Sequence, residues 1–450
     1  MDSIASNITH VVVHAMPAAW GHNKPLCALV VHILEDHPEI VVTYFTAFGI
    51  YFKIIAQLKR LEPARYAAIE SRMNIIDISG PDFDLLKPLD TFESNFQALY
   101  SSSHVTCLTT KKTINGLPRP TLAIIDPFTP YAFEAIRKTA GQRVSILAWW
   151  TSNAGSLLRL LGPAHLGGVA EPALETAEGR AEIKRKIFAG EQIKSPVTNI
   201  AAGVEKTGSI YIREADGVIC VSTPCFEPEA DAVVKEWFAS MSKAWYTVGP
   251  LLIHPPNMTL RLIQAKSESD ILVEAFLDRI QKEFGNKSLL YFPAEVKKKI
   301  DTSGIAMELG WSPQELILTH PVTGWFLTHG GWNSVQEAFT HRVPMIFWPF
   351  QADQPYIVMR MLALKAALEL IEVRTGIVGA RIPYKCKELP AFTPASAKAE
   401  ILRLVEKLRL NEGSVIRHNF EAVASTVGQA WNVPDGESRK NVLALLKKYL

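Results

Sequence analysis

The chain has 450 residues, 48% of them hydrophobic and 20% charged, with 47 Lys and Arg against 45 Asp and Glu. This composition is ordinary for globular proteins and excludes a disordered, collagen-like or coiled-coil chain, and the length predicts two large α/β domains or three smaller ones. A net charge of +2 provides no broad basic surface, so we expect no nucleic-acid partner. No apolar run approaches the roughly 20 residues of a membrane span and the first residues lack a signal-peptide pattern, so we expect no transmembrane segment and a cytoplasmic location.

The first half of the chain alternates between strand and helix patterns. Apolar strands are predicted at 10–14, 40–47, 75–79, 122–126, 144–150 and 216–222, and helices at 26–37 and 131–141. Near-continuous apolar strands joined by helical segments are typical of a parallel sheet that is buried on both faces.

A second, smaller α/β domain is predicted after a linker. Residues 248–258 contain one Gly and three Pro, which places a domain boundary near residue 255. Further strands are predicted at 288–292, 324–328 and 343–348, and the last residues, 438–450, have the apolar spacing of a helix.

The sequence gives no reason to expect a metal centre. Five scattered cysteines exclude a disulfide framework, and the one close pair, Cys220 and Cys225, lacks both the CxxC spacing and a neighbouring His/Cys cluster. An acidic pair, Asp82 and Asp84, lies between Gly-Pro and Pro and is interpreted as a solvated loop.

The densest signal lies in residues 310–355. A predicted strand ends in His329-Gly330-Gly331, and a helix is predicted to begin near Ser334. Glycines let backbone N–H groups approach a ligand and a helix N-terminus attracts anions, so a diphosphate ligand is one interpretation. The alternative is a capping box, in which Glu337 reaches back to the Ser334 N–H and no ligand is involved. Both interpretations stay open on local grounds.

The segment from Trp311 to Gln354 resembles the donor-binding signature of the family 1 UDP-dependent glycosyltransferases. These enzymes act on small molecules and have two facing Rossmann-like domains, the GT-B architecture. The match comprises WxPQ, TH, GW, NS, E, VP, WP and ADQ over 44 residues. The residues between these motifs resemble fungal members of the family more than plant members.

The resemblance implies how the donor is held. Trp311 would stack on the uracil ring, Gln314 would lie near the base and ribose, and Glu337 would accept from ribose hydroxyls. Four residues would hold the diphosphate: His329, Gly331, Asn333 and Ser334.

The sugar of the donor would be bonded by Trp332, Asp353 and Gln354. A final glutamine is usual for glucose donors, so the resemblance implies UDP-glucose. The UDP-sugar is a co-substrate, and neither a cofactor nor a metal is expected.

The N-terminal half supplies a second element of the resemblance. Gly21-His22, followed by Pro25 in the predicted loop after the first strand, resembles the family's GHxxP motif, whose His is the general base. Asp126 ends another predicted strand, where the family has an Asp that orients this His. The implied reaction is an inverting single displacement, in which His22 deprotonates an acceptor hydroxyl and UDP leaves. A nicotinamide-dependent oxidoreductase is disfavoured, because the first strand is not followed by GxGxxG.

The chain departs from the family pattern in the second domain. Residues 288–292 are followed directly by the segment leading to Trp311, so a Gly/Ser loop, a helix and a strand are missing between 292 and 293. Losing packed elements can cost more than a domain's whole stability, so a catalytically impaired remnant or gene-model variant that binds UDP weakly or not at all is the rival interpretation. Smaller departures are Gly330, where Cys is common, and Arg342, where Gly is usual and the backbone conformation is unusual.

We therefore expect an α/β protein of the GT-B type with a shortened second domain. Residues 1–254 would bind the acceptor, 255–430 would bind the UDP-sugar, and 431–450 would form a C-terminal helix that packs back on the first domain. The expected activity is transfer of glucose to a hydroxyl of a lipophilic small molecule. The sequence predicts neither the identity of this molecule nor the oligomeric state of the protein.

Overall fold

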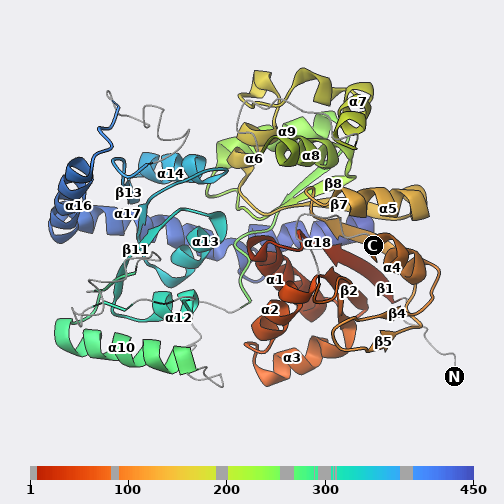
Figure 1. Cartoon of the computed structure of the whole chain (residues 1–450), viewed down its shortest axis with the longest axis horizontal. Coiled ribbons are helices and arrows are strands. Elements are labelled where there is room, and N and C mark those ends of the chain that lie inside the picture. Colours follow the sequence, from red (N-terminus) through yellow and green to blue (C-terminus); the bar gives the residue numbers. More distant parts are fainter. Residues whose placement is uncertain are drawn as a thin grey trace. The chain divides into compact units, whose positions relative to one another are not determined.

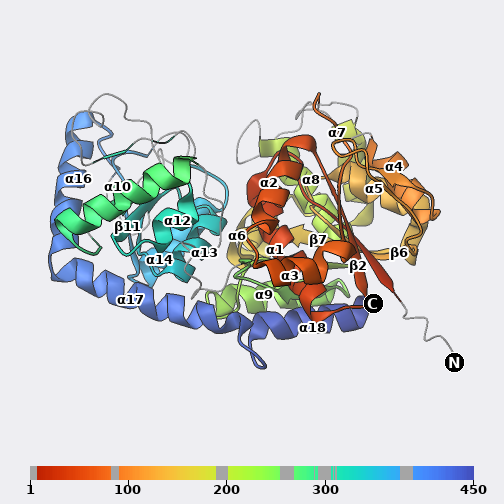
Figure 2. The same ribbon diagram turned by 90° about the horizontal axis from the view of Figure 1, so that it is seen from below.

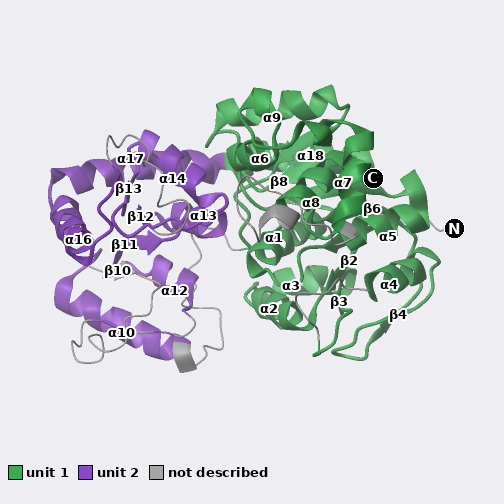
Figure 3. Cartoon of the chain, turned by 45° about the horizontal axis from the view of Figure 1, so that its top comes forward, with its two compact units in different colours: residues 1–253, 430–450 green, residues 254–429 purple. Residues whose placement is uncertain are grey.

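A computed structural model of the chain describes residues 8–82, 91–188, 201–253, 268–287, 289–291, 306–307, 309, 312–374 and 389–450. The chain divides into two compact units, coloured separately in Figure 3: unit 1 is Met1–Ile253 with Ala430–Leu450, and unit 2 is His254–Gln429. The boundaries expected from the sequence, at 254/255 and 430/431, fall within one residue of these divisions.

Unit 1 is built on a sheet of seven parallel strands. Their order is β3-β2-β1-β6-β7-β8-β9. The chain therefore adds β2 and β3 on one side of β1 and the later strands, from β6 on, on the other side. The strands are β1 (Thr9–His14), β2 (Ile40–Thr46), β3 (Met73–Asp77), β6 (Pro120–Ile125), β7 (Ser145–Trp150), β8 (Gly217–Cys220) and β9 (Ala244–Thr247). The six strands predicted in this half are confirmed within a few residues, and β9 was not predicted.

Helices connect these strands, and the red and orange elements lie in one half of unit 1 with the yellow and green ones in the other (Figure 1). The helices are α1 (Trp20–Asp36), α2 (Phe48–Leu58), α3 (Pro63–Ile69), α4 (Thr91–Tyr100), α5 (Pro130–Ala140), α6 (Ala154–Leu161), α7 (Ala177–Phe188), α8 (Ala201–Glu214), α9 (Pro228–Ser240) and α18 (Glu437–Tyr449). A short antiparallel pair, β4 (Val105–Thr106) with β5 (Thr113–Ile114), lies outside the main sheet.

Both faces of the unit 1 sheet are buried. Alternate strand residues such as Val12, Ile125 and Trp150 pack in one core cluster with residues of α4, α5 and α8. Trp149 points to the opposite face and is 0% exposed, and its indole reaches α1. This double burial explains why the strands are near-continuous apolar runs.

Unit 2 contains a smaller parallel sheet, with four strands in the order β10-β11-β12-β13 among the residues that are described. These are β10 (Leu289–Tyr291), β11 (Thr323–Thr328), β12 (Met345–Phe347) and β13 (Ala367–Glu369). Its described helices are α10 (Glu268–Phe284), α12 (Gln314–Thr319), α13 (Trp332–His341), α14 (Gln354–Ala363), α16 (Pro394–Arg409) and α17 (Asn411–Gly428). The predicted break between 292 and 293 lies outside the described residues, so the shortening stays a prediction.

The C-terminal segment returns to unit 1. Helix α18 packs against β9, and Figure 2 marks the C-terminus that follows it. Ser438 donates from its hydroxyl to the Gly249 carbonyl, and Asn441 donates to the Thr247 carbonyl at 2.8 Å. In the described part of the chain, no helix is both long and apolar enough to cross a membrane.

Candidate functional site

His22 and Asp126 come from the two strands between which the chain reverses direction. Asp126 directly follows β6, and His22 lies in the segment after β1, which pairs with β6 in parallel. Open α/β sheets bind ligands beyond the carboxyl ends of their strands at this kind of switch point. The sheet order therefore brings together two residues that are 104 positions apart.

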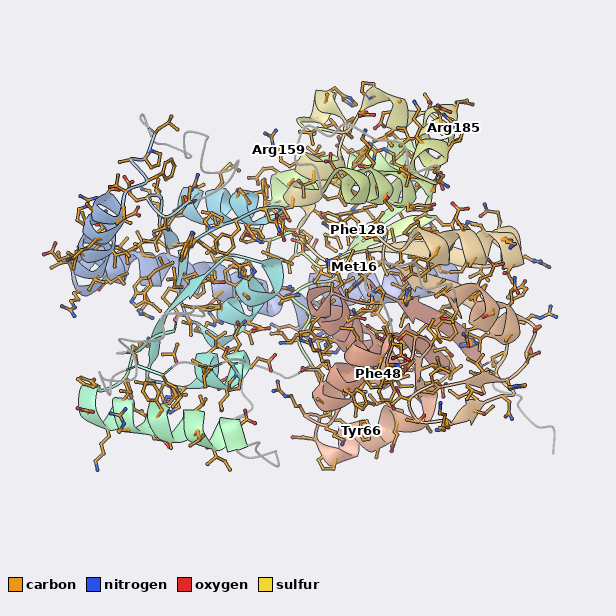
Figure 4. All side chains as sticks on the ribbon, in the orientation of Figure 1. Met16, Phe48, Tyr66, Phe128, Arg159 and Arg185 are labelled. Carbon is orange, nitrogen blue, oxygen red and sulfur yellow. The ribbon has the colours of Figure 1, made fainter. Side chains whose placement is uncertain are left out.

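The imidazole of His22 is bonded to a fully buried carboxylate. His22 Nδ1 lies 2.6 Å from Asp126 Oδ2, with side-chain exposures of 23% and 0%. Asp126 Oδ2 also accepts from the Met16 N–H at 3.2 Å, and Oδ1 accepts from the Phe128 N–H at 3.0 Å; Figure 4 labels both donor residues. Because the Asp126 carboxylate can only accept a hydrogen bond from Nδ1, that nitrogen carries the proton in neutral His22 and Nε2 is the basic atom.

The expectation that His22 lies in a loop is wrong. Helix α1 already begins at Trp20, so His22 is in its first turn. The His22 and Asn23 N–H groups donate to the Ala19 carbonyl at 3.1 and 3.3 Å. Pro25 also lies inside this helix, so the whole GHxxP motif is helical.

An aromatic ring lies beside His22. The Phe128 and His22 ring centroids are 5.9 Å apart in an edge-on arrangement. A Cβ at Gly208 would lie 2.5 Å from Phe128 Cε1, so only glycine at 208 leaves room for this ring. The neighbourhood of the imidazole is therefore partly apolar.

In unit 2, the predicted diphosphate residues gather where β11 leads into α13. His329 and Gly330 follow β11, and Gly331 is the N-cap of α13, with no side-chain cap. A Cβ at Gly331 would lie 2.5 Å from His329 Nε2, so glycine is what lets this imidazole lie against the helix start. Gly330 has a φ of +84° and a Cβ there would lie 2.9 Å from Phe347, so glycine is required on two grounds.

The structure excludes the capping-box alternative. Helix α13 begins at Trp332 and not near Ser334, so Ser334 already lies within its first turn. Glu337 instead accepts a hydrogen bond from Gln314 Nε2 at 2.6 Å, and the same amide is 3.2 Å from Ser334 Oγ. Helix α12 thus brings Gln314 together with two predicted site residues of α13.

The remaining residues at the α13 start differ in what they can offer a ligand. Trp332 is 4% exposed, so its contribution at the helix start is the backbone N–H rather than the indole. Asn333 accepts from Gln336 Nε2 at 3.5 Å and is half-buried. Desolvation lowers the pKa of His329 although its surface is open to solvent, and the Asp353 carboxylate opposes this shift.

Asp353 and Gln354 lie at the start of α14, which follows the neighbouring strand β12. Asp353 is the N-cap residue of α14 and makes no side-chain cap. Gln354 Oε1 accepts from the backbone N–H groups of Phe350 and Gln351 at 2.7 and 3.1 Å. The amide oxygen therefore orders its own turn, and the Nε2 group is the part suited to a sugar hydroxyl.

Trp311, expected to stack on a base, lies outside the described residues, as does Asp84. Within the described ranges, no three or more His, Cys, Asp or Glu side chains gather as a metal ion needs. Sequence reasoning missed the Met16 and Phe128 N–H donors to Asp126, because any residue type supplies a backbone N–H.

Comparison with known proteins finds similarity to UDP-glycosyltransferases. Residues 292–376 match the family model described as UDP-glucoronosyl and UDP-glucosyl transferase. The UDP-glycosyltransferase eriJ of Hericium erinaceus is 24% identical over 512 residues, covering 97% of this chain and 98% of the relative. The solanidine UDP-glucose glucosyltransferase 1 of Solanum tuberosum is 34% identical over 146 residues, which is 31% of this chain and 27% of that protein.

A solved structure shows the same fold. The Medicago truncatula UGT71G1 complexed with UDP-glucose matches with a TM-score of 0.66 at 18% identity, covering 100% of both chains. The fold is therefore the GT-B architecture expected from the resemblance. The chain is thus similar to UDP-glycosyltransferases in three respects: the family match around the α13 site, the full-length similarity to the Hericium protein, and the fold.

Proposed function

We propose that the chain transfers glucose from UDP-glucose, with inversion at the anomeric carbon, to a hydroxyl of a lipophilic small molecule. Its family performs glycosyl transfer from UDP-sugars to small molecules; the sugar, the stereochemistry and the acceptor class are the proposal. The observation that carries it is the 2.6 Å contact between His22 Nδ1 and the buried Asp126 carboxylate.

The His22–Asp126 pair is suited to general base catalysis. His22 Nε2 takes the proton of the acceptor hydroxyl, and the Asp126 carboxylate stabilises the imidazolium that forms. The acceptor oxygen then forms a bond to the anomeric carbon from the face opposite UDP while the bond from that carbon to the phosphate oxygen breaks. One displacement inverts the configuration, and the electron pair leaves with UDP.

The start of α13 is suited to the leaving diphosphate. Backbone N–H groups and the helix dipole favour negative charge at a helix N-terminus, and His329, Asn333 and Ser334 add polar side chains there. Charge that develops on the phosphate oxygen is stabilised by groups that are already in place, which lowers the barrier to bond cleavage.

Three further assignments, for the ribose, the sugar and the acceptor, support the proposal. Gln314 and Glu337 bond each other beside Ser334, and a carboxylate is suited to accept from the vicinal hydroxyls of ribose. Asp353 and Gln354 at the α14 start are suited to sugar hydroxyls. Phe128, with its ring edge-on to His22, favours an apolar acceptor. No cofactor is part of the proposal.

A specific observation keeps the impaired remnant as a second candidate. The alignment with the Hericium protein spans 512 residues, whereas this chain has 450, so at least 62 aligned positions of the relative have no counterpart here. If these fall in the donor-binding unit, UDP would bind weakly or not at all.

Calorimetric titration with UDP and UDP-glucose, beside melting curves, separates the two candidates. Saturable binding with a raised melting temperature supports the enzyme. A folded chain that binds neither ligand supports the remnant. With binding established, His22→Ala should lower turnover of a phenolic acceptor panel by roughly 100- to 10,000-fold with UDP affinity nearly unchanged. Unchanged turnover would remove His22 from the base role.

A further inference from the structure

Helix α1 has a weak point in the turn that carries His22. Pro25 lies inside this helix and has no N–H, so it cannot donate to the Gly21 carbonyl as an ordinary helical residue would. The proline ring also crowds that carbonyl. The helix ladder alone therefore constrains the His22 backbone less than it would in a regular helix.

Two fully buried side chains bond the backbone around this turn. Trp149, on β7, donates from Nε1 to the His22 carbonyl at 3.0 Å. Asn23 donates from Nδ2 to the Met16 carbonyl at 2.9 Å and to the Ala19 carbonyl at 2.8 Å. Both side chains are 0% exposed, so neither can touch a substrate.

The Asn23 amide is itself held in one orientation. The Tyr44 hydroxyl donates to Asn23 Oδ1 at 3.1 Å, which leaves the NH₂ group facing the two carbonyls. Tyr44 is a β2 residue with 0% exposure. The strand next to β1 thereby fixes the segment that joins β1 to α1.

This bonding reaches the catalytic carboxylate through one residue. Asn23 holds the Met16 carbonyl, and the Met16 N–H donates to Asp126 Oδ2, the same oxygen that accepts from His22 Nδ1. A shift of the Met16 backbone would therefore change how Asp126 orients the imidazole. The two partners of the pair are held from both sides, His22 through Trp149 and Asp126 through Asn23.

We propose that Asn23 and Trp149 are positioning residues that set the His22 imidazole against Asp126, and so determine the turnover rate but not the substrate affinity. The proposal rests on the proposed function of His22 as the base. Misplacing a reacting group by about 1 Å can cost about 100-fold in rate, so buried hydrogen bonds of this kind are enough to matter.

Trp149→Phe is the sharpest variant, because it keeps an aromatic ring and removes the N–H donor. We expect kcat to fall about tenfold with both KM values within about twofold of wild type. The acidic limb of the pH–rate profile should move to lower pH, since a looser contact with Asp126 stabilises the imidazolium less. Asn23→Ala should behave in the same way, and Tyr44→Phe, which leaves both Nδ2 bonds in place, should have a smaller effect.

Trp245→Phe is the matched control. Trp245 lies on the edge strand β9, is 7% exposed, and donates from Nε1 to Asp231 Oδ1 at 2.8 Å. It should lose a similar amount of thermal stability with kcat within about twofold of wild type. Equal losses of kcat in both variants would assign the Trp149 effect to general destabilisation and overturn the inference.

A double variant tests whether Trp149 acts through His22. Residues that act as one unit are not additive, so Trp149→Phe should not lower the residual turnover of His22→Ala further. A further tenfold loss in that background would contradict the inference. Failure of the proposed function looks different: wild type would show no UDP-glucose-dependent transfer, or His22→Ala would equal wild type. Wild-type turnover that Trp149→Phe and Asn23→Ala leave unchanged would overturn the inference alone.

Discussion

Gly331 is the residue on which the geometry of the α13 start depends most directly. A Cβ at this position would lie 2.5 Å from His329 Nε2, well inside van der Waals contact. Gly331→Ala should push the imidazole away from the helix start and weaken UDP binding about tenfold, because a hydrogen bond to a charged group contributes roughly 1.5–3 kcal/mol. Calorimetric titration with UDP measures the effect.

The control for this substitution is a glycine with room around it. A Cβ at Gly49 in α2 would meet nothing within 4 Å. Gly49→Ala should raise the unfolding free energy by up to about 1 kcal/mol and leave UDP affinity unchanged. UDP affinity that survives Gly331→Ala would show that His329 does not contact the diphosphate.

The family resemblance pairs His22 with Asp126, and the structure places their side chains 2.6 Å apart. Their catalytic roles stay predictions. The sequence does not predict which atoms of a side chain stay available to a ligand, because this depends on packing. The Gln354 amide oxygen accepts from two N–H groups of its own turn, and the Trp332 indole is buried.

At the scale of elements, the start of α6 is stabilised by a buried acid. Glu227 is 1% exposed and accepts from the Ala154 and Gly155 N–H groups, at 2.5 and 3.0 Å, and from Ser222 Oγ. Burial raises its pKa from 4.5 to about 7, against the lowering effect of these hydrogen bonds.

This raised pKa predicts a loss of stability as pH rises. A carboxyl whose pKa is higher in the folded state contributes stability that is fully present below pH 4.5 and is lost as pH rises through about 7. The loss is up to about 3 kcal/mol at 1.36 kcal/mol per pKa unit. Urea unfolding of wild type and Glu227→Gln between pH 5 and 8 measures it, and parallel pH dependences would contradict the assignment.

The end of α13 carries a residue in an unusual conformation. Arg342 is the C-cap with a φ of 59° and a ψ of 38°, which confirms the expected irregular backbone. Its guanidinium does not crowd the turn but donates to the Glu421 carbonyl at 3.1 Å and to Ser425 Oγ at 2.5 Å on α17. The left-handed backbone of Arg342 is unfavourable, and the hydrogen bonds of its side chain to α17 offset this cost.

Two substitutions at Arg342 separate the cost of the backbone conformation from the contribution of the side-chain contacts. Arg342→Ala keeps the left-handed backbone and loses the contacts, so it should lower the unfolding free energy by about 1 kcal/mol. Arg342→Gly loses the same contacts but removes a backbone cost of about 1–2 kcal/mol, so it should be more stable than the alanine variant and close to wild type. Denaturant unfolding of both variants decides the question, and equal stabilities would mean that the backbone is not strained.

Element type follows from apolar spacing more reliably than element boundaries do. The strands predicted from near-continuous apolar runs are all present in the two sheets. The start of α13 was misplaced, because Ser334 and Glu337 have the spacing of a capping box while tertiary contact with Gln314 determines the use of the glutamate. Helix α1 begins at Trp20, before the apolar residues that predict it. Hydrogen bonds from Asn23 and Trp149 hold the backbone of this first turn, and apolar spacing does not reveal them.

For the whole molecule, the last residues of the chain complete the first unit. Their bonding partners lie far back in the sequence: Trp431 Nε1 donates to the Val248 carbonyl at 3.1 Å, and the Tyr449 hydroxyl donates to the Asp216 carbonyl at 3.1 Å. The Trp431 ring stacks on His32 of α1 with centroids 4.4 Å apart. Apolar spacing predicts the helix, but the face that covers it is some 200 residues away and has no local signal.

Helix α18 should therefore stabilise unit 1 and not unit 2. Leu445 is 1% exposed, so Leu445→Ala should lower the unfolding free energy of unit 1 by about 2–5 kcal/mol through lost burial and a cavity. Leu443, on the same helix, is 40% exposed, and Leu443→Ala should change stability by about 0.5 kcal/mol or less. Calorimetry with and without UDP identifies the units, since UDP raises the transition of the unit that binds it. We expect Leu445→Ala to lower only the transition that UDP does not raise; a shift of the UDP-sensitive transition alone would show that the C-terminal helix supports the donor-binding unit instead.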